Sequence, residues 1–255
     1  MKRDDLFVQI PYPQLAWYLW LIRLGRVNVE TFVNHRTLDS YRVEEVERLR
    51  ARLDKCRIAR NIHGPILNAY SEGFEAFVSY WRKALEFAAR LGAGALVMHA
   101  ERERTPSRST DEWVRGMLGP LKEIVSIAEH NGVTVLLENH YERRAEAIVR
   151  LLGQVNSVRL GACFDIGHFH AFGDKRPIEF LDDYPQGTIR EVHLSDNRGD
   201  NDSHLALGDG NVDFPRFFDE IDRRGMSPVY VIEAKDAWGA LKGMRYLRRI
   251  GEIVE

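Results

Sequence analysis

Short apolar runs alternate along the chain with stretches in which apolar residues recur every three or four positions. Eight of the runs are rich in Val, Ile, Leu or Phe and have the length of strands covered on both faces. They span residues 6–10, 27–33, 57–63, 95–100, 133–139, 158–165, 189–195 and 228–234. The amphipathic stretches between them predict helices at Val43–Leu53, Ser71–Leu91, Asp111–His130, Ala145–Val155 and Phe214–Arg224.

Strands that alternate with helices favour a parallel sheet, and eight such units favour a closed barrel over an open one. No low-complexity linker divides the 255 residues, and no phosphate-binding glycine motif of the open nucleotide-binding sheets is present. We therefore expect an α/β fold, a single (β/α)8 TIM barrel, as one domain spanning residues 1–255.

Composition narrows the class of protein. The formal net charge of -2 provides no overall basic field for nucleic acid or an anionic membrane, although charge alone leaves nucleic acid open. The start has no signal-type apolar stretch, Leu15–Leu24 is too short to cross a bilayer, and Cys56 and Cys163 are the only cysteines. A cytoplasmic enzyme with no membrane partner is expected. Trp17, Trp20 and Leu21 predict one helix face that packs on the sheet; an oligomer interface is the alternative.

Six of the predicted strands end in a histidine or a carboxylate. Such side chains are costly inside an apolar barrel, and the carboxyl ends of parallel barrel strands open on one face. Their repetition therefore indicates a shared site and predicts that it binds a metal. The six residues are His63, His99, Glu138, Asp165, His193 and Glu233.

Two further segments add polar residues to this face. Asp165 and His168 form an Asp-x-x-His motif in which one turn can place a carboxylate and an imidazole on the same cavity. A long loop rich in glycine and polar residues follows His193 and contains Asp202 and His204. These two residues either add ligands or form a solvated pair.

The ordered motifs, from Asn61-Ile62-His63-Gly64-Pro65 to Val231-Ile232-Glu233, resemble the xylose isomerase-like TIM barrel superfamily. This superfamily includes sugar phosphate isomerases and epimerases and also endonuclease IV (AP endonuclease family 2). The resemblance covers nearly the whole chain, and it is more specific for the superfamily than for a substrate. In the ketose epimerase branch it implies one divalent ion, commonly manganese, held by Glu138, Asp165, His193 and Glu233. It also implies that His168 and Arg198 hold sugar hydroxyls.

These residues suit chemistry on a small ketose or polyol. A cation that chelates a carbonyl and the neighbouring hydroxyl acidifies the adjacent C–H and stabilises an enediolate. Glu138 and Glu233, on strands expected to face each other across the ring, would serve as acid and base. Return of the proton to the opposite face gives epimerisation, and return to the neighbouring carbon gives isomerisation. Loss of a hydroxyl would give dehydration, and the residues do not select among the three.

A competing hypothesis is an endonuclease IV-like phosphodiesterase that acts on abasic-site DNA with several zinc ions. That resemblance assigns His63, His99 and Glu138 to a first zinc, the four ligands above to a second, and His168, Asp202 and His204 to a third. The chain departs from the endonuclease pattern at Gly167, which replaces a cysteine or threonine, and at Asn197-Arg198, where a lysine is missing. The segment after His193 is also shorter.

A third hypothesis is an inactive relative that serves as a binding module. Such a relative is expected to lose metal ligands, yet this chain keeps residues of the ligand types in the expected order.

The donor types suit manganese, zinc, cobalt or iron, with one ion expected and up to three accommodated. Lys235 and Lys242 are the only lysines near the last two turns, and no glycine-rich phosphate loop accompanies them. Whether the substrate is phosphorylated therefore stays open.

Overall fold

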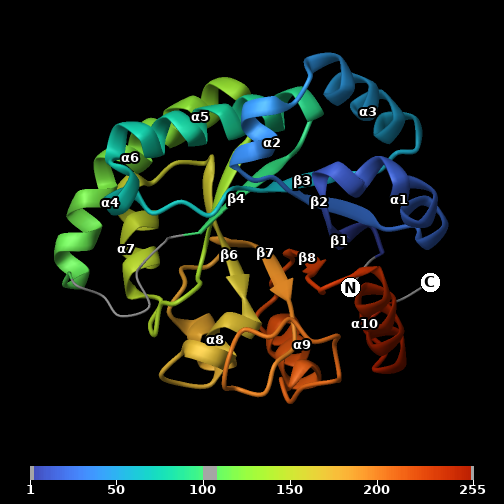
Figure 1. The fold of residues 1–255 in the computed structure, drawn as a ribbon. Coiled ribbons are helices and arrows are strands. Elements are labelled where there is room, and N and C mark those ends of the chain that lie inside the picture. Colours follow the sequence, from blue (N-terminus) through green and yellow to red (C-terminus); the bar gives the residue numbers. More distant parts are fainter. Residues whose placement is uncertain (1–2, 100–107, 254–255) are drawn as a thin grey trace.

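Eight parallel strands close a barrel in the computed structural model, which describes residues 3–99 and 108–253 (Figure 1). Neighbouring strands pair in chain order and β1 pairs with β8, so the ring has no free edge. The predicted (β/α)8 barrel is confirmed. The strands are β1 (Leu6–Pro11), β2 (Asn28–Phe32), β3 (Arg60–His63), β4 (Ala95–His99), β5 (Thr134–Glu138), β6 (Leu160–Asp165), β7 (Ile189–Leu194) and β8 (Val229–Ile232).

Helices cover the outside of the barrel. Each predicted strand overlaps an observed one, with ends that differ by up to three residues; residue 100 lies outside the described residues. The helices are α1 (Tyr12–Gly25), α2 (His35–Ser40), α3 (Val43–Lys55), α4 (Ala69–Glu72), α5 (Phe74–Leu91), α6 (Thr110–Asn131), α7 (Glu146–Val155), α8 (Ile166–Phe172), α9 (Phe214–Arg223) and α10 (Ala237–Arg249), with 3-10 turns η1 (Arg3–Asp5) and η2 (Pro177–Asp182).

Two details of the helices differ from the sequence prediction. The helix predicted over Ser71–Leu91 is divided into α4 and α5, because Gly73 has a φ of +83°, a conformation that L side chains rarely adopt. In α1, Leu19 and Ile22 face the sheet, whereas Trp17 is 80% exposed and Trp20 is 64% exposed. The prediction that the tryptophan face packs on the sheet is wrong, because α1 is apolar on more than one side.

The core has two parts. A large cluster between barrel and helices includes the fully buried Phe77, Trp81 and Phe87. A smaller cluster inside the barrel contains Ala95, Val97, Leu136 and Cys163. Small apolar side chains therefore fill part of the barrel interior, while polar side chains gather at the carboxyl ends of the strands. None of the described helices is long and apolar enough to cross a bilayer.

Candidate active site

Four of the predicted ligands meet at the carboxyl ends of adjacent strands. Glu138 ends β5, Asp165 ends β6, His193 is the fifth residue of β7 and Glu233 follows β8. The register pairs Asp165 directly with His193, so the two lie at one level of the barrel. All four side chains are buried, and one ligand atom from each lies within 4.8 Å of the others. The barrel thus brings three carboxylates and one imidazole to a single point.

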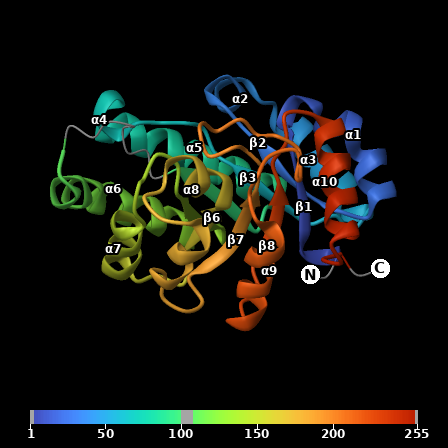
Figure 2. The ribbon, with the colours of Figure 1, turned by 90° about the horizontal axis from the view of Figure 1, so that it is seen from below.

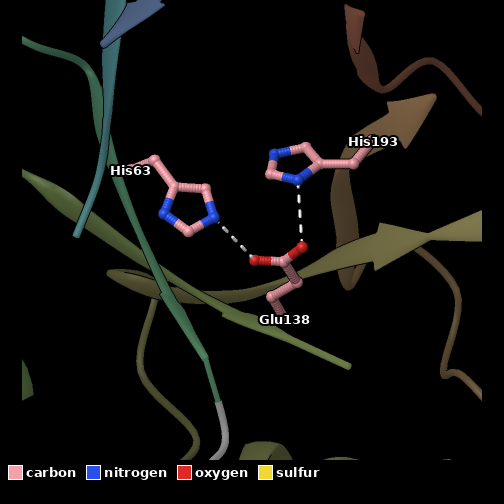
Figure 3. Close-up of side chains that lie close together, drawn as sticks. All are labelled: His63, Glu138 and His193. Atoms are coloured by element: carbon pink, nitrogen blue, oxygen red, sulfur yellow. Dashed lines mark hydrogen bonds and ion pairs between the residues drawn. The ribbon is translucent and has the colours of Figure 1, made fainter. Parts of the chain in front are cut away.

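The ring of His193 has a different set of neighbours at each nitrogen. Its Nδ1 lies 3.0 Å from Glu138 Oε1 and 3.3 Å from Glu233 Oε1. Its Nε2 lies 3.2 Å from Glu191 Oε1 and 3.5 Å from Glu30 Oε2. Figure 3 shows the Nδ1 edge turned toward Glu138. Burial opposes the charged ring, but Cys163 and the surrounding carboxylates outweigh it and raise the pKa of His193 well above its usual range, so both nitrogens donate when no cation is bound. With a cation bound, the ring would keep its Nε2 proton for Glu191 and offer Nδ1 as a ligand.

The histidines at the ends of β3 and β4 reach the same carboxylate from another side. His63 Nε2 lies 3.1 Å from Glu138 Oε2, and His99 Nε2 lies 2.9 Å from the same oxygen. Figure 3 shows His63 and His193 next to each other, each with a nitrogen directed at a different oxygen of the Glu138 carboxylate. Glu138 therefore bridges the four-residue ligand cluster and the two outer histidines.

The Asp-x-x-His motif forms the first turn of α8. Asp165 is the N-cap of this helix, and its Oδ1 accepts a 2.6 Å hydrogen bond from the backbone N–H of His168. His168 Nδ1 lies 2.7 Å from the backbone oxygen of Asn139, to which it donates. The unusual Gly167 is explained by packing, because a Cβ there would lie 2.1 Å from Ser195 Oγ.

The loop between β7 and α9 folds back over this point. His168 Nε2 lies 3.4 Å from Asp202 Oδ2, and His204 Nε2 lies 2.9 Å from the same oxygen. His204 Nδ1 is 3.7 Å from Glu233 Oε2, which links the loop to the inner cluster. Arg198, on the same loop, is exposed, so the structure does not bring this predicted substrate contact into the buried cluster.

One buried carboxylate organises that loop. Asp196 is fully buried and lies two residues after the end of β7, the strand that presents His193. It accepts backbone N–H hydrogen bonds of 2.8–3.1 Å from four residues: Asn197, Gly208, Gly210 and Val212. The backbone of Asp196 also pairs with Leu205 in an isolated antiparallel bridge. Sequence reasoning missed Asp196, and its only signal was an aspartate that precedes a glycine-rich loop.

A second polar layer lies beside the predicted ligands inside the barrel and was also missed. Glu30 and Glu191 are fully buried, and the Gln9 amide donates to both Glu30 and Glu233. The Asn61 amide donates to Glu191, and its oxygen accepts from the backbone of β4. Glu191 could have been found by the two-residue period of a strand, because it stands two positions before a predicted ligand and so faces the same side.

A further imidazole missed by the sequence reasoning joins the outer group. His140 follows the strand-end segment of β5, and its ring centroid lies 4.7 Å from those of His99 and His168. One ligand atom each from His140, His168 and Asp202 lie within 4.8 Å of one another. Burial and the two neighbouring imidazoles lower the pKa of His140 to about 3, which keeps it neutral at pH 7.

The crowded carboxylates shift one another's protonation. Burial raises the pKa of Asp165 to about 6, and burial together with the charge of Glu30 raises the pKa of Glu191 to about 8. Burial also opposes ionisation of Glu138, but the imidazoles beside it outweigh this effect and hold its pKa well below the usual range. In the absence of a cation, the site therefore holds protons that carboxylates normally lose.

The donor set fits a divalent cation. Asp165 Oδ2 is buried without a hydrogen-bond partner among the described residues, although carboxylate oxygens inside proteins normally have one. Three carboxylates and one imidazole are ligands that manganese and zinc accept. The four-residue group of Glu138, Asp165, His193 and Glu233 is thus the best candidate metal centre, and the His140 group is a second one.

Comparison with known proteins agrees with this architecture. The sequence profile of a family described as the xylose isomerase-like TIM barrel matches residues 24–250. An uncharacterized protein of Methanocaldococcus jannaschii is 32% identical over 183 residues, which are 68% of this chain and 61% of that protein, less than two thirds of its length. The L-ribulose-5-phosphate 3-epimerase UlaE of Salmonella typhi is 28% identical over 60% of this chain and 54% of its own. The crystal structure of a D-tagatose 3-epimerase-like protein superposes with a TM-score of 0.80 at 25% identity, over 96% of both chains.

Proposed function

The chain belongs to the xylose isomerase-like TIM barrel family, and we propose that it is a divalent-metal-dependent isomerase or epimerase of a ketose or polyol. The observation that carries the proposal is the convergence of one imidazole and three buried carboxylates at the carboxyl ends of β5 to β8. The relatives named D-tagatose 3-epimerase-like protein and L-ribulose-5-phosphate 3-epimerase support the same class of substrate.

We assign one ion, manganese or zinc, to Glu138, Asp165, His193 and Glu233. When bound, such an ion would hold a carbonyl and the neighbouring hydroxyl of the substrate and stabilise the enediolate formed on proton removal. The protein supplies the orientation of its ligands. Nε2 of His193 donates to Glu191, so Nδ1 faces inward, and the N-cap bond of Asp165 leaves its Oδ2 toward the cluster.

We assign the proton transfers to Glu138 and Glu233. They come from β5 and β8, which β6 and β7 separate, so they are not diametrically opposite as expected from the sequence. Their carboxylates nevertheless flank His193 Nδ1, at 3.0 and 3.3 Å. One would remove a proton from a substrate carbon, and the other would return a proton to the opposite face or to the neighbouring carbon. His168 is assigned to a substrate hydroxyl, and the exposed Arg198 is left out.

The test is incorporation of solvent deuterium into candidate ketoses by the purified protein, with metal content measured in parallel. We expect about one ion per chain and exchange at a single carbon. Glu138→Gln and Glu233→Gln should each abolish exchange. The matched control is Glu142→Gln, because Glu142 is a buried carboxylate outside the four assigned ligands, and its Oε2 accepts a 2.6 Å hydrogen bond from the backbone N–H of His140. Exchange that persists in both variants would refute the paired glutamates, and metal analysis of each variant separates lost ligation from lost proton transfer.

A second candidate function is cleavage of a phosphodiester in abasic-site DNA with up to three zinc ions. The observation that favours it is the outer group of imidazoles: His63 and His99 on one oxygen of Glu138, and His168 and His204 on one oxygen of Asp202. Zinc at about three ions per chain together with nicking of abasic DNA would replace the epimerase proposal. A folded protein that binds no added metal would instead favour a binding module.

A further inference from the structure

The three most exposed aromatic side chains lie on two neighbouring helices, α1 and α10. Trp17 is 80% exposed, Trp20 64% and Trp238 61%, and Leu24 and Leu241 lie on the same two helices. Together these five residues define the α1–α10 face. The three indoles alone expose on the order of 300–500 Å². An apolar patch of that size matches the largest on a typical monomer and is often functional.

The two helices also leave an apolar groove between them. A cavity of about 410 Å³ separates α1 from α10 and reaches the outer surface of β1. It is lined by apolar side chains that include Ile10, Tyr18, Leu21, Ala240, Leu241 and Met244. Figure 2 shows α1 and α10 side by side at one edge of the barrel. The helices that carry the exposed tryptophans therefore also enclose a largely apolar groove, to which Leu241 of the exposed set contributes.

The charge of this face is one-sided. The chain has 38 acidic residues, yet neither Tyr12–Gly25 nor Ala237–Arg249 contains one. Cations occupy the same two segments and the C-cap of α1: Arg23, Arg26, Lys242, Arg245, Arg248 and Arg249. Lys242 is paired with Asp209 at 3.0 Å, and the exposed Asp236 caps α10, so the five arginines carry the excess positive charge. The Arg245 guanidinium lies over the Trp238 ring at 5.6 Å, so cation and indole form a single surface. A local basic field thus stands out on a chain whose formal net charge is -2.

We propose that the α1–α10 face docks the barrel on an anionic lipid surface. Tryptophans and leucines flanked by arginines are the side chains that enter the headgroup region of a bilayer while their cations remain near the phosphates. A second copy of this chain is a less favourable partner for the α1–α10 face, because a symmetric dimer would bring the same cations close together. The attachment is peripheral, since none of the described helices could cross a bilayer.

The test uses the full chain with phosphatidylcholine vesicles, with and without phosphatidylserine. Three of the five tryptophans lie on this face, while Trp81 and Trp113 are buried, so tryptophan emission reports directly on insertion. We expect a blue shift and co-sedimentation only with phosphatidylserine, both reversed by high salt. The variant Trp17→Ser/Trp20→Ser should weaken binding about tenfold or more. Its matched control is Val158→Ser, at a residue that is 81% exposed outside this face.

Charge reversal tests the role of the arginines in vesicle binding independently. Arg245→Glu should weaken vesicle binding at least about fivefold, while Arg216→Glu on α9 should not. Circular dichroism establishes that each variant is folded. The proposal is overturned if the wild-type protein does not bind anionic vesicles, or if it binds pure phosphatidylcholine vesicles equally well. It is also overturned if the protein is a dimer in solution and Trp17→Ser/Trp20→Ser dissociates that dimer.

Discussion

Replacement of Glu191 should weaken metal binding although Glu191 is not itself assigned as a ligand. Its Oε1 lies 3.2 Å from His193 Nε2, and both side chains are fully buried. In Glu191→Leu the ring loses the acceptor that keeps its proton on Nε2 and its Nδ1 toward the cluster. Glu191→Gln retains an acceptor oxygen of nearly the same size and is the matched control.

The magnitude follows from that one contact. Loss of the acceptor leaves the buried Nε2–H of His193 unpaired, which costs about 1–3 kcal/mol. Because about 1.4 kcal/mol corresponds to tenfold in affinity, Glu191→Leu should raise the dissociation constant of Mn²⁺ or Zn²⁺ about 10- to 100-fold. Folding stability should not fall in parallel with affinity, because two effects on it oppose each other. Leucine removes a carboxylate buried beside Glu30, which has an oxygen without a hydrogen-bond partner among the described residues, but it also leaves the Asn61 amide without its acceptor.

The assay is isothermal titration of the metal-free variants, with melting temperatures measured on the same samples. We expect Glu191→Gln to bind within a few-fold of wild type and Glu191→Leu to bind weakly while it remains folded. Wild-type affinity in Glu191→Leu would refute the positioning role. Equal losses in both variants would show that the charge of Glu191, rather than its hydrogen bond to His193, determines affinity.

Three further predictions concern the loop, the packing of α8 and the pH dependence. Asp196→Ala leaves buried backbone N–H groups unpaired, at a cost of about 1–3 kcal/mol each. Hydrogen exchange across residues 197–213 should therefore accelerate, while the β-strands stay protected. Unchanged exchange rates in this loop would count against the role of Asp196. Gly167→Ala places a Cβ 2.1 Å from Ser195 Oγ and should lower the free energy of unfolding, measured in urea, by about 1–3 kcal/mol. The double variant Gly167→Ala/Ser195→Ala should recover part of this loss. No recovery would exclude the contact with Ser195 Oγ as the cause. In the metal-free protein, burial disfavours the charged ring of His204, but the hydrogen bond to Asp202 and nearby carboxylates outweigh it and raise its pKa from 6.5 to about 9. A raised pKa stabilises the fold fully below pH 6.5, and this contribution is lost as the pH rises to about 9. The melting temperature should therefore fall between pH 6.5 and about 9, and His204→Gln should make this fall smaller. Parallel curves of melting temperature against pH for wild type and variant would disprove the assignment.

Much of the fold was accessible from the pattern of apolar residues. Strands buried on both faces are short and continuously apolar, so eight of them could be counted, and parallel order followed from the helices between them. The pattern failed where more than one side of an element is apolar. In α1 the periodicity fits both the face of Leu19 and that of Trp17, and only packing distinguishes the buried one.

The polar residues were predictable at the ends of strands and much less so elsewhere. His63 and Glu138 stand out because they interrupt apolar runs, whereas Glu30 and Glu191 lie within or at the start of strands and resemble ordinary polar positions. Loop residues were the least certain. Arg198 is exposed, while its neighbour Asn197 is fully buried and donates to the backbone oxygen of Gly167.

The sequence by itself determined which residues stand at the carboxyl ends of the strands, and parallel order then required those ends to share one rim. It could not determine how far apart the side chains lie, because distances depend on the stagger of strands around the closed ring. Only the tertiary structure placed His193 Nδ1 between Glu138 and Glu233 and turned its Nε2 to Glu191. Burial of several carboxylates at one point, which a divalent cation would balance, is likewise a property of the closed barrel rather than of any single strand.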